Sequence, residues 1–149
     1  MKTLRYSIKI NRPQEFVFNK IRDKSVYADW AKAWGEGMTY EGVWEVGENI
    51  SFFDTTQGGT KVIIEEFRPN EYIRARHIAM VNPENVEVEL QDEMMKKWIG
   101  SLEEYHFTKE GDEQTLVEVN MTVDEAFQEM FDGTWPKALG FFKEVCEKD

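Results

Sequence analysis

The last quarter of the chain has the spacing of an amphipathic helix. Its apolar side chains recur every three or four residues and therefore share one face: Trp135, Ala138, Leu139, Phe142, Val145 and Cys146. A helix with this much aromatic surface must pack against another part of the chain. We therefore expect the preceding segments to form a layer against which this helix lies.

The start of this helix allows two arrangements. Thr122 and Glu125 have the spacing of a capping box, which predicts a first helical segment that ends near Phe131. Thr134 could then cap a second segment that carries Pro136 in its first turn. The alternative is one long helix that is kinked at Pro136.

Most of the preceding chain alternates between apolar and polar side chains, as half-buried strands do. Within one of the alternating segments, Arg74 and Arg76 take the solvent-facing positions, so His77 points to the apolar side. Short turns rich in glycine and asparagine join most of the segments, which indicates an antiparallel sheet. The alternation covers seven segments: residues 4–10, 39–46, 50–52, 61–67, 73–77, 105–107 and 117–121.

Residues 13–34 are predicted to form two short helices between the first two strands. Asn11 and Gln14 have capping-box spacing ahead of the first helix, with Pro13 in its first turn. Ser25 can cap the second helix. The side chains expected to face inward are Phe16, Val17 and Ile21 from the first helix and Val26, Tyr27, Trp30 and Trp34 from the second.

Residues 82–97 are the least regular part of the chain, polar and acidic, and they end in Met94, Met95, Lys96 and Lys97. We expect a long connection that could hold a helical turn. A lid over a binding site and a solvated loop without a role are both consistent with its length.

The predicted order of elements is a strand, two helices, six strands and a helix. Helices at the two ends of an antiparallel sheet indicate an α+β fold. We therefore predict a seven-stranded curved antiparallel sheet around a long C-terminal helix, with two short helices between strands 1 and 2. No internal repeat or linker divides the chain, so residues 1–149 are predicted to form a single domain.

The composition narrows the partners that we expect. A formal net charge of −11 disfavours binding to nucleic-acid backbones and to anionic membrane surfaces. The single cysteine, Cys146, excludes an intramolecular disulfide and a cysteine-based zinc site, and its place in the helix stripe indicates a buried core residue. No segment has the layout of a signal peptide or the length of a membrane span, which favours a soluble, cytoplasmic protein.

The inward-facing positions of the sheet and helices could line a pocket for a small molecule, because apolar walls with a few polar groups are typical of such pockets. The alternative is that the same side chains fill the core. The candidate cavity residues are Trp30, Tyr40, Trp44, Phe52, Ile64, Ala75, His77, Glu103, Tyr105, Phe107, Val117, Val119, Trp135, Leu139 and Phe142.

His77 carries the most distinctive chemistry among these candidates. Glu103 and Tyr105 share the inward parity of their strand, so a His–Glu–Tyr group could orient a polar ligand or perform acid–base chemistry. The alternative is a hydrogen-bonded core histidine. His106 has the opposite parity to Tyr105, so the two histidines of the chain are expected on opposite faces of the sheet. We therefore predict no metal site, and we predict no cofactor. Because no nucleophile motif or phosphate-binding loop can be recognised, no catalytic residue is assigned.

Five stretches of the chain together carry a family resemblance: residues 12–18, the region around Trp30, and residues 65–70, 104–108 and 134–139. With them the chain resembles the START-related helix-grip superfamily (SRPBCC), in the branch named for the activator of a heat-shock-chaperone ATPase. The resemblance covers essentially the whole chain. It implies an incomplete β-barrel that grips a long C-terminal helix around a hydrophobic cavity.

The resemblance also implies a function, because members bind lipids, hormones or polyketides and a minority catalyse cyclisation or hydrolysis. The leading hypothesis is binding of a small hydrophobic molecule. The alternatives are a cyclase or hydrolase that uses His77, Glu103 and Tyr105, and a co-chaperone-like interaction domain that uses the acidic surface or residues 94–98. Chaperone activation is the weaker expectation, because the co-chaperone carries a separate chaperone-binding domain that this sequence does not show. Exposed aromatic residues such as Phe53 and Phe141 leave room for a homodimer.

Overall fold

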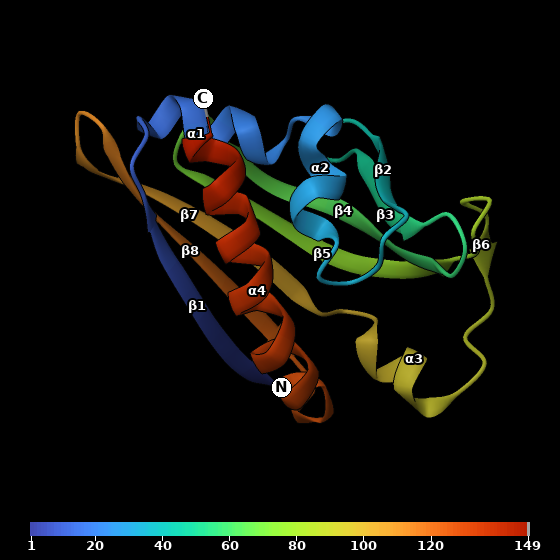
Figure 1. Cartoon of the computed structure of the whole chain (residues 1–149). Coiled ribbons are helices and arrows are strands. Elements are labelled where there is room, and N and C mark those ends of the chain that lie inside the picture. Colours follow the sequence, from blue (N-terminus) through green and yellow to red (C-terminus); the bar gives the residue numbers. More distant parts are fainter. Residues whose placement is uncertain (149) are drawn as a thin grey trace.

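The computed structural model describes residues 1–148 as an α+β fold built on one curved antiparallel sheet (Figure 1). The strand order is β1-β8-β7-β5-β4-β3-β2, and the short β6 pairs with β5. The predicted seven strands are confirmed, and the two residues of β6 are too few to produce a recognisable alternation. The strands are β1 Lys2–Ile10, β2 Met38–Gly42, β3 Asn49–Asp54, β4 Gly58–Arg68, β5 Tyr72–Val81, β6 Glu87–Val88, β7 Leu102–Gly111 and β8 Gln114–Val123.

The helices cover the concave side of this sheet. The long helix α4 crosses it diagonally over β1, β8 and β7, and α2 lies beside α4 on the side of β2 to β5 (Figure 1). After β6 the chain leaves the sheet, and residues 89–101 place α3 near the start of α4 (Figure 1). The helices are α1 Gln14–Ile21, α2 Lys24–Ala31, α3 Glu93–Trp98 and α4 Gln128–Glu147, with the 3₁₀ turn η1 Glu125–Phe127 before α4.

The closing helix is continuous, so of the two predicted arrangements the single helix is correct. Thr134 does not cap a second segment, because its hydroxyl donates to the carbonyl oxygen of Met130 within the helix. Pro136 lies inside α4, whose buried side chains on both sides of the proline anchor it to the sheet. The predicted capping box is wrong, because Thr122 belongs to β8 and its hydroxyl pairs with that of Thr3 on β1. Asp124 caps the turn η1 instead.

The caps predicted for the first two helices are also wrong. Pro13 is the N-cap residue of α1, and the Gln14 side chain donates to the carbonyl oxygen of Phe107 instead of closing a capping box with Asn11. The cap of α2 is Asp23, whose carboxylate accepts hydrogen bonds from the backbone N–H and the hydroxyl of Ser25.

The inner face of α1 also differs from the prediction. Phe16 is exposed, and Phe18 takes the inward position between Phe67 and Phe107. Val17 and Ile21 are buried as predicted. The spacing therefore predicted the helix correctly, but it assigned Phe16 instead of Phe18 to the buried face.

Two further positions on the β2–β3 side differ from the sequence pattern. The strand β2 ends at Gly42, whose φ of 137° favours glycine and whose Cβ would lie 2.2 Å from the Asn49 carbonyl oxygen. Val46 is therefore exposed beyond the strand. Phe53, predicted to be exposed, is buried because β2 and β4 flank it, with Thr39 on one side and Gly59 on the other. The dimer hypothesis loses this part of its basis.

The register of β5 and β7 positions the candidate polar residues. Ala75 pairs with Glu103 and Ile73 pairs with Tyr105, so both β7 residues face the concave side. Beyond Arg76 the pairing continues through the backbone N–H of His77, which donates to the carbonyl oxygen of Ser101. The inward parity predicted for His77 is confirmed, since only 2% of this residue is exposed.

Candidate ligand cavity

A cavity of about 360 Å³ lies between the concave face of the sheet, α2, α3 and the first turns of α4. Its walls are almost entirely apolar. All five tryptophans of the chain border it: Trp30, Trp34, Trp44, Trp98 and Trp135. The other residues that border it are Ile21, Tyr27, Phe52, Gly59, Thr60, Ile73, His77, Met80, Met94, Met95, Glu103, Tyr105, Phe127, Met130 and Phe131.

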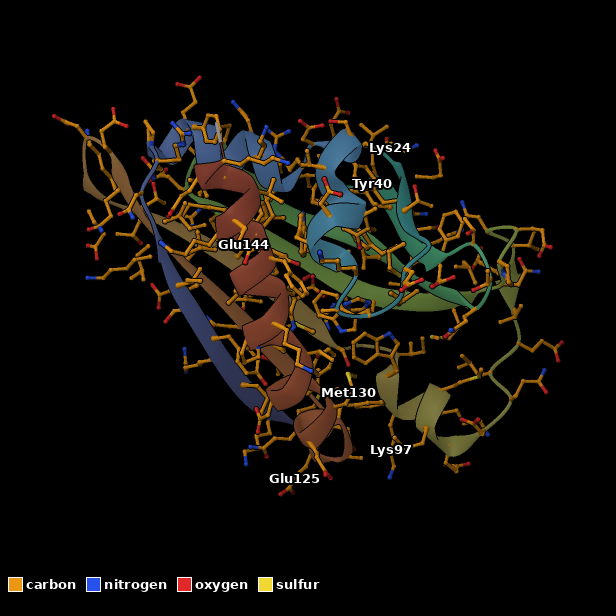
Figure 2. All side chains as sticks on the ribbon, viewed as in Figure 1. Lys24, Tyr40, Lys97, Glu125, Met130 and Glu144 are labelled. Atoms are coloured by element: carbon orange, nitrogen blue, oxygen red, sulfur yellow. The ribbon has the colours of Figure 1, made fainter. Side chains whose placement is uncertain are left out.

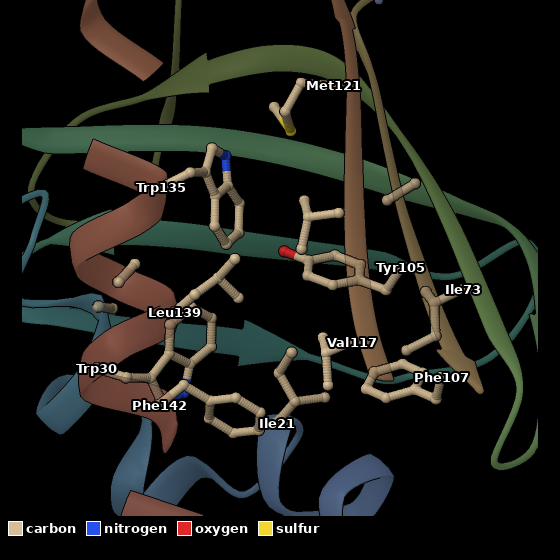
Figure 3. Close-up of a cluster of buried hydrophobic side chains, with 14 of the residues drawn as sticks. Ile21, Trp30, Ile73, Tyr105, Phe107, Val117, Met121, Trp135, Leu139 and Phe142 are labelled. Atoms are coloured by element: carbon tan, nitrogen blue, oxygen red, sulfur yellow. The ribbon is translucent and has the colours of Figure 1, made fainter. Parts of the chain in front are cut away.

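The structure divides the predicted cavity residues into two groups. One group borders the cavity: Trp30, Trp44, Phe52, His77, Glu103, Tyr105 and Trp135. The other group lies in the packed core away from the cavity wall: Tyr40, Ile64, Ala75, Phe107, Val117, Val119, Leu139 and Phe142. Figure 3 shows members of both groups, with Trp135 and Tyr105 above Leu139 and Phe142.

Sequence analysis missed the part of the wall that comes from α3 and from the start of α4. Met94, Met95 and Trp98 line the cavity from α3, and Met130, at the start of α4, also lines it (Figure 2). A signal for this helix was present, because Asp92 caps it by accepting from the backbone N–H of Met95. Six residues are too short a segment for a helical period to be recognised.

The tryptophans pack against one another around the cavity. Trp30 and Trp135 are stacked with their ring centroids 6.5 Å apart, and Trp34 meets Trp135 edge to face at 4.8 Å. Trp98 closes the α3 side against Phe131, with centroids 5.7 Å apart. Aromatic rings from three separate parts of the chain therefore form much of the wall.

One polar network interrupts this aromatic surface. His77 Nε2 lies 3.1 Å from Glu103 Oε1, and the Tyr105 hydroxyl donates to Oε2 of the same carboxylate. On the other side of the ring, His77 Nδ1 lies 2.9 Å from the Thr60 hydroxyl, which also accepts from the Trp98 indole N–H. The His–Glu–Tyr group considered from the sequence is thus assembled, and it is joined to α3 through Thr60.

The network satisfies His77 in either of two protonation states. In the neutral ring, Thr60 donates to Nδ1 and the Nε2–H donates to Glu103. In the charged ring, Nδ1–H donates to Thr60, whose own hydroxyl has the Ala79 carbonyl oxygen 3.4 Å away. Both ring nitrogens and both oxygens of Glu103 are engaged in each case.

The charge of Glu103 dominates the electrostatics of the cavity. Burial and the nearby carboxylate raise the pKa of Tyr105 well above its ordinary value, and the same two causes raise the pKa of Tyr27. Among the described residues that border the cavity there is no lysine or arginine. Glu103 is the only carboxylate among the described residues that border the cavity.

Three of the tryptophans have no hydrogen-bond partner for their indole nitrogen within the described residues: Trp30, Trp44 and Trp135. Each of these nitrogens is buried, so the rings present their carbon atoms to the cavity. Trp98 differs from them because its N–H is bonded to Thr60.

Other candidate chemistry lies elsewhere. Cys146 is fully buried, and burial raises the pKa of its thiol to about 12, which makes it a poor nucleophile. His106 lies on the opposite face of the sheet from His77 and packs against the Tyr72 ring, with centroids 4.7 Å apart. Within residues 1–148 no group of three potential metal ligands comes together.

Comparison with known proteins places the fold. No family model and no curated protein sequence matches the chain. The Aha1 dimer from Colwellia psychrerythraea is similar in structure, with a TM-score of 0.73 and 18% identity over 99% of this chain and 98% of that chain. Protein MLL2253 from Mesorhizobium loti has a TM-score of 0.76 and 13% identity over 99% of both chains. CalU16 from Micromonospora echinospora has a TM-score of 0.68 and 18% identity over 98% of this chain and 76% of that chain.

These similarities define the class of fold. The chain has the fold of these proteins, the helix-grip arrangement of a curved antiparallel sheet around a long C-terminal helix, and its structural neighbours include an Aha1 protein, as the sequence resemblance predicted. Among the helices of the described residues, none combines the length and the apolar character that crossing a membrane requires.

Proposed function

We propose that the protein binds a small, largely apolar molecule in the cavity beneath α4. The observation that carries the proposal is the cavity itself: about 360 Å³ of space lined by all five tryptophans. This volume lies within the range of about 300–1,000 Å³ that is usual for small-molecule sites.

The energetics of the wall support an occupant. Aromatic side chains that border empty space lose dispersion contacts on that side, and a ligand of matching shape would restore them. The rest of the core does not have this property, because Phe142 and Val117 are completely buried against other side chains. The aromatic surface is therefore concentrated where packing within the chain leaves a gap.

A cyclase or hydrolase is the second candidate function, and the network of His77, Glu103 and Tyr105 favours it. These groups lie at the wall of an apolar cavity, where acid–base chemistry is effective. However, both nitrogens of His77 already have partners, so a substrate would have to displace Thr60 or Glu103 to reach the ring. This arrangement favours binding over catalysis.

Homodimerisation remains a proposal alongside ligand binding. Its support is the similarity to the dimeric Aha1 protein of Colwellia psychrerythraea. Of the aromatic residues expected to promote it, Phe141 is half-buried, beneath the Lys32 ammonium group.

The first test is native mass spectrometry of freshly purified protein, compared with its mass after denaturation. A ligand would appear as excess mass that disappears on denaturation. A protein that purifies empty is then titrated with N-phenyl-1-naphthylamine, an uncharged probe that fluoresces in apolar sites.

Two variants of β5 locate the probe. Met80→Trp enlarges a side chain of the cavity wall, and we expect the probe to bind about tenfold more weakly, equivalent to about 1.4 kcal/mol. Ile78→Trp on the same strand changes a side chain that is 38% exposed and does not border the cavity, so it serves as the matched control. Equal binding to both variants, or no binding to the unmodified protein, would contradict the proposal.

A further inference from the structure

We infer that the ligand of this cavity is an organic cation, an amine or a quaternary ammonium compound whose charge lies beside Glu103. This inference rests on the proposed function, because it names the chemical class that the same cavity selects. It is carried by the combination of one carboxylate with an aromatic wall whose described residues include no lysine or arginine.

The first step concerns which polar group the ligand meets. The side chain of Glu103 is 16% exposed, whereas that of His77 is 3% exposed. The carboxylate is therefore the more accessible member of the pair. It accepts one hydrogen bond at each oxygen, from His77 and Tyr105, and each oxygen has a further lone pair for a donor. An ammonium group can supply both the donor and the compensating charge.

The second step concerns what surrounds this carboxylate. The faces of tryptophan, tyrosine and phenylalanine attract cations, and aromatic cages of this kind recognise alkylammonium groups. Trp98, Trp135 and Tyr105 all border the cavity that contains Glu103, and Figure 3 shows the Tyr105 hydroxyl directed from β7 toward Trp135. The unpaired indole nitrogens of Trp30 and Trp135 are covered, so they are not available as donors to an anion.

The third step excludes the opposite charge. A carboxylate ligand would lie in a cavity whose described lining has no lysine or arginine to neutralise it. It would also meet the charge of Glu103, whose influence raises the pKa of both Tyr27 and Tyr105 in addition to their burial. The formal net charge of −11 further attracts cations and repels anions during approach.

A set of three probes with the same apolar body tests the inference: 4-phenylbutylamine, 4-phenylbutanol and 5-phenylpentanoate. Their binding is followed at neutral pH by tryptophan fluorescence, because all five tryptophans border the cavity. We expect the amine to bind about tenfold more tightly than the alcohol, and the carboxylate to bind most weakly. This ranking is measured on the unmodified protein and does not depend on the folding of any variant.

Two variants at neighbouring positions assign the preference to one residue. Glu103→Gln removes the charge from the cavity, and we expect the amine and the alcohol to bind this variant within about twofold of each other. Glu104→Gln is the matched control, because Glu104 precedes Tyr105 on the opposite face of β7 and bonds to Tyr72. It should retain the tenfold preference of the unmodified protein.

The outcomes separate this inference from the proposed function. If the alcohol binds at least as tightly as the amine, or if the amine preference survives in Glu103→Gln, the inference is overturned while ligand binding stands. If none of the three probes binds and the uncharged naphthylamine probe also fails, the proposed function and the inference both fail.

Discussion

The two halves of α4 share one apolar stripe, but the C-terminal half covers packed core and the N-terminal half covers a cavity. In the filled end, defined by Leu139, Phe142 and Cys146, the inward side chains of the helix are buried in the hydrophobic core and do not border the cavity. In the cavity end, defined by Phe131 and Trp135, the helix borders open space. An amphipathic stripe therefore reports that a helix face is buried, and it does not report how completely that face is packed.

The difference arises from what lies opposite each half. The C-terminal half meets α1 and β1, whose Val17 and Ile10 are completely buried. The N-terminal half faces the polar network around His77 and the separate helix α3. The buried carboxylate and imidazole on this side need hydrogen-bond partners, which Thr60 and Tyr105 supply, whereas the apolar layer on the other side has no such requirement.

The largest predicted effect compares two phenylalanines on α4. Phe142 and Phe131 are 0% and 4% exposed, so their burial is matched, but only Phe131 borders the cavity. We expect Phe142→Ala to lower the free energy of unfolding by about 4 kcal/mol, because it opens a new void in a packed core. Phe131→Ala should cost about 2 kcal/mol, because its ring already lacks contacts on one side.

Urea unfolding followed by far-UV circular dichroism measures both costs. The comparison holds if the slope of free energy against urea is unchanged in the two variants. Costs that agree within about 0.5 kcal/mol would mean that the cavity end is as fully packed as the filled end.

Much of this architecture could be predicted because strand parity and helix spacing are local properties. The alternation around Arg74 and Arg76 placed His77 on the concave face, and the parity of β7 placed Glu103 and Tyr105 there as well. The group they form follows from the pairing of β5 with β7, which brings inward-facing residues of adjacent strands together.

The sequence could not locate the cavity within the apolar interior. Tyr40 and Ile64 have the same inward pattern as Phe52, but only Phe52 borders the open space. This distinction depends on how non-adjacent elements fit together, and no local period encodes it. The capping box predicted for α1 failed for a related reason, since the Gln14 side chain donates to the carbonyl oxygen of Phe107, far away in the chain.

A smaller effect distinguishes two tryptophans of the cavity wall. Trp98 and Trp44 are both partly buried, but the Trp98 indole donates to Thr60, whereas that of Trp44 has no partner in the described part of the chain. Trp98→Phe should lower the free energy of unfolding by about 1 kcal/mol more than Trp44→Phe, because only the first loses a hydrogen bond. The same variant should speed amide hydrogen exchange in α3, measured by mass spectrometry, and equal costs with unchanged exchange would argue against an anchored α3.

The smallest predicted effect is a change in stability at alkaline pH, which tests the burial and the charge around Tyr105 in the cavity end. The pKa of Tyr105 is raised in the folded protein, first by burial and then by the charge of Glu103. In the unfolded chain it returns to its ordinary value of about 10, so above that pH the folded state holds more protons and stability falls as pH rises.

Tyr105→Phe removes this contribution and should make the decline shallower. The difference between the two proteins should grow by about 0.4 kcal/mol between pH 8 and pH 10, in urea unfolding measured at both values. Cys146, whose pKa burial raises to about 12, produces its own alkaline decline in the filled end, but both proteins contain it and it cancels. Parallel curves for the two proteins would mean that the Tyr105 hydroxyl ionises as readily in the folded state as in the unfolded chain. That result would contradict the conclusion that burial and the charge of Glu103 act on Tyr105 in the cavity end.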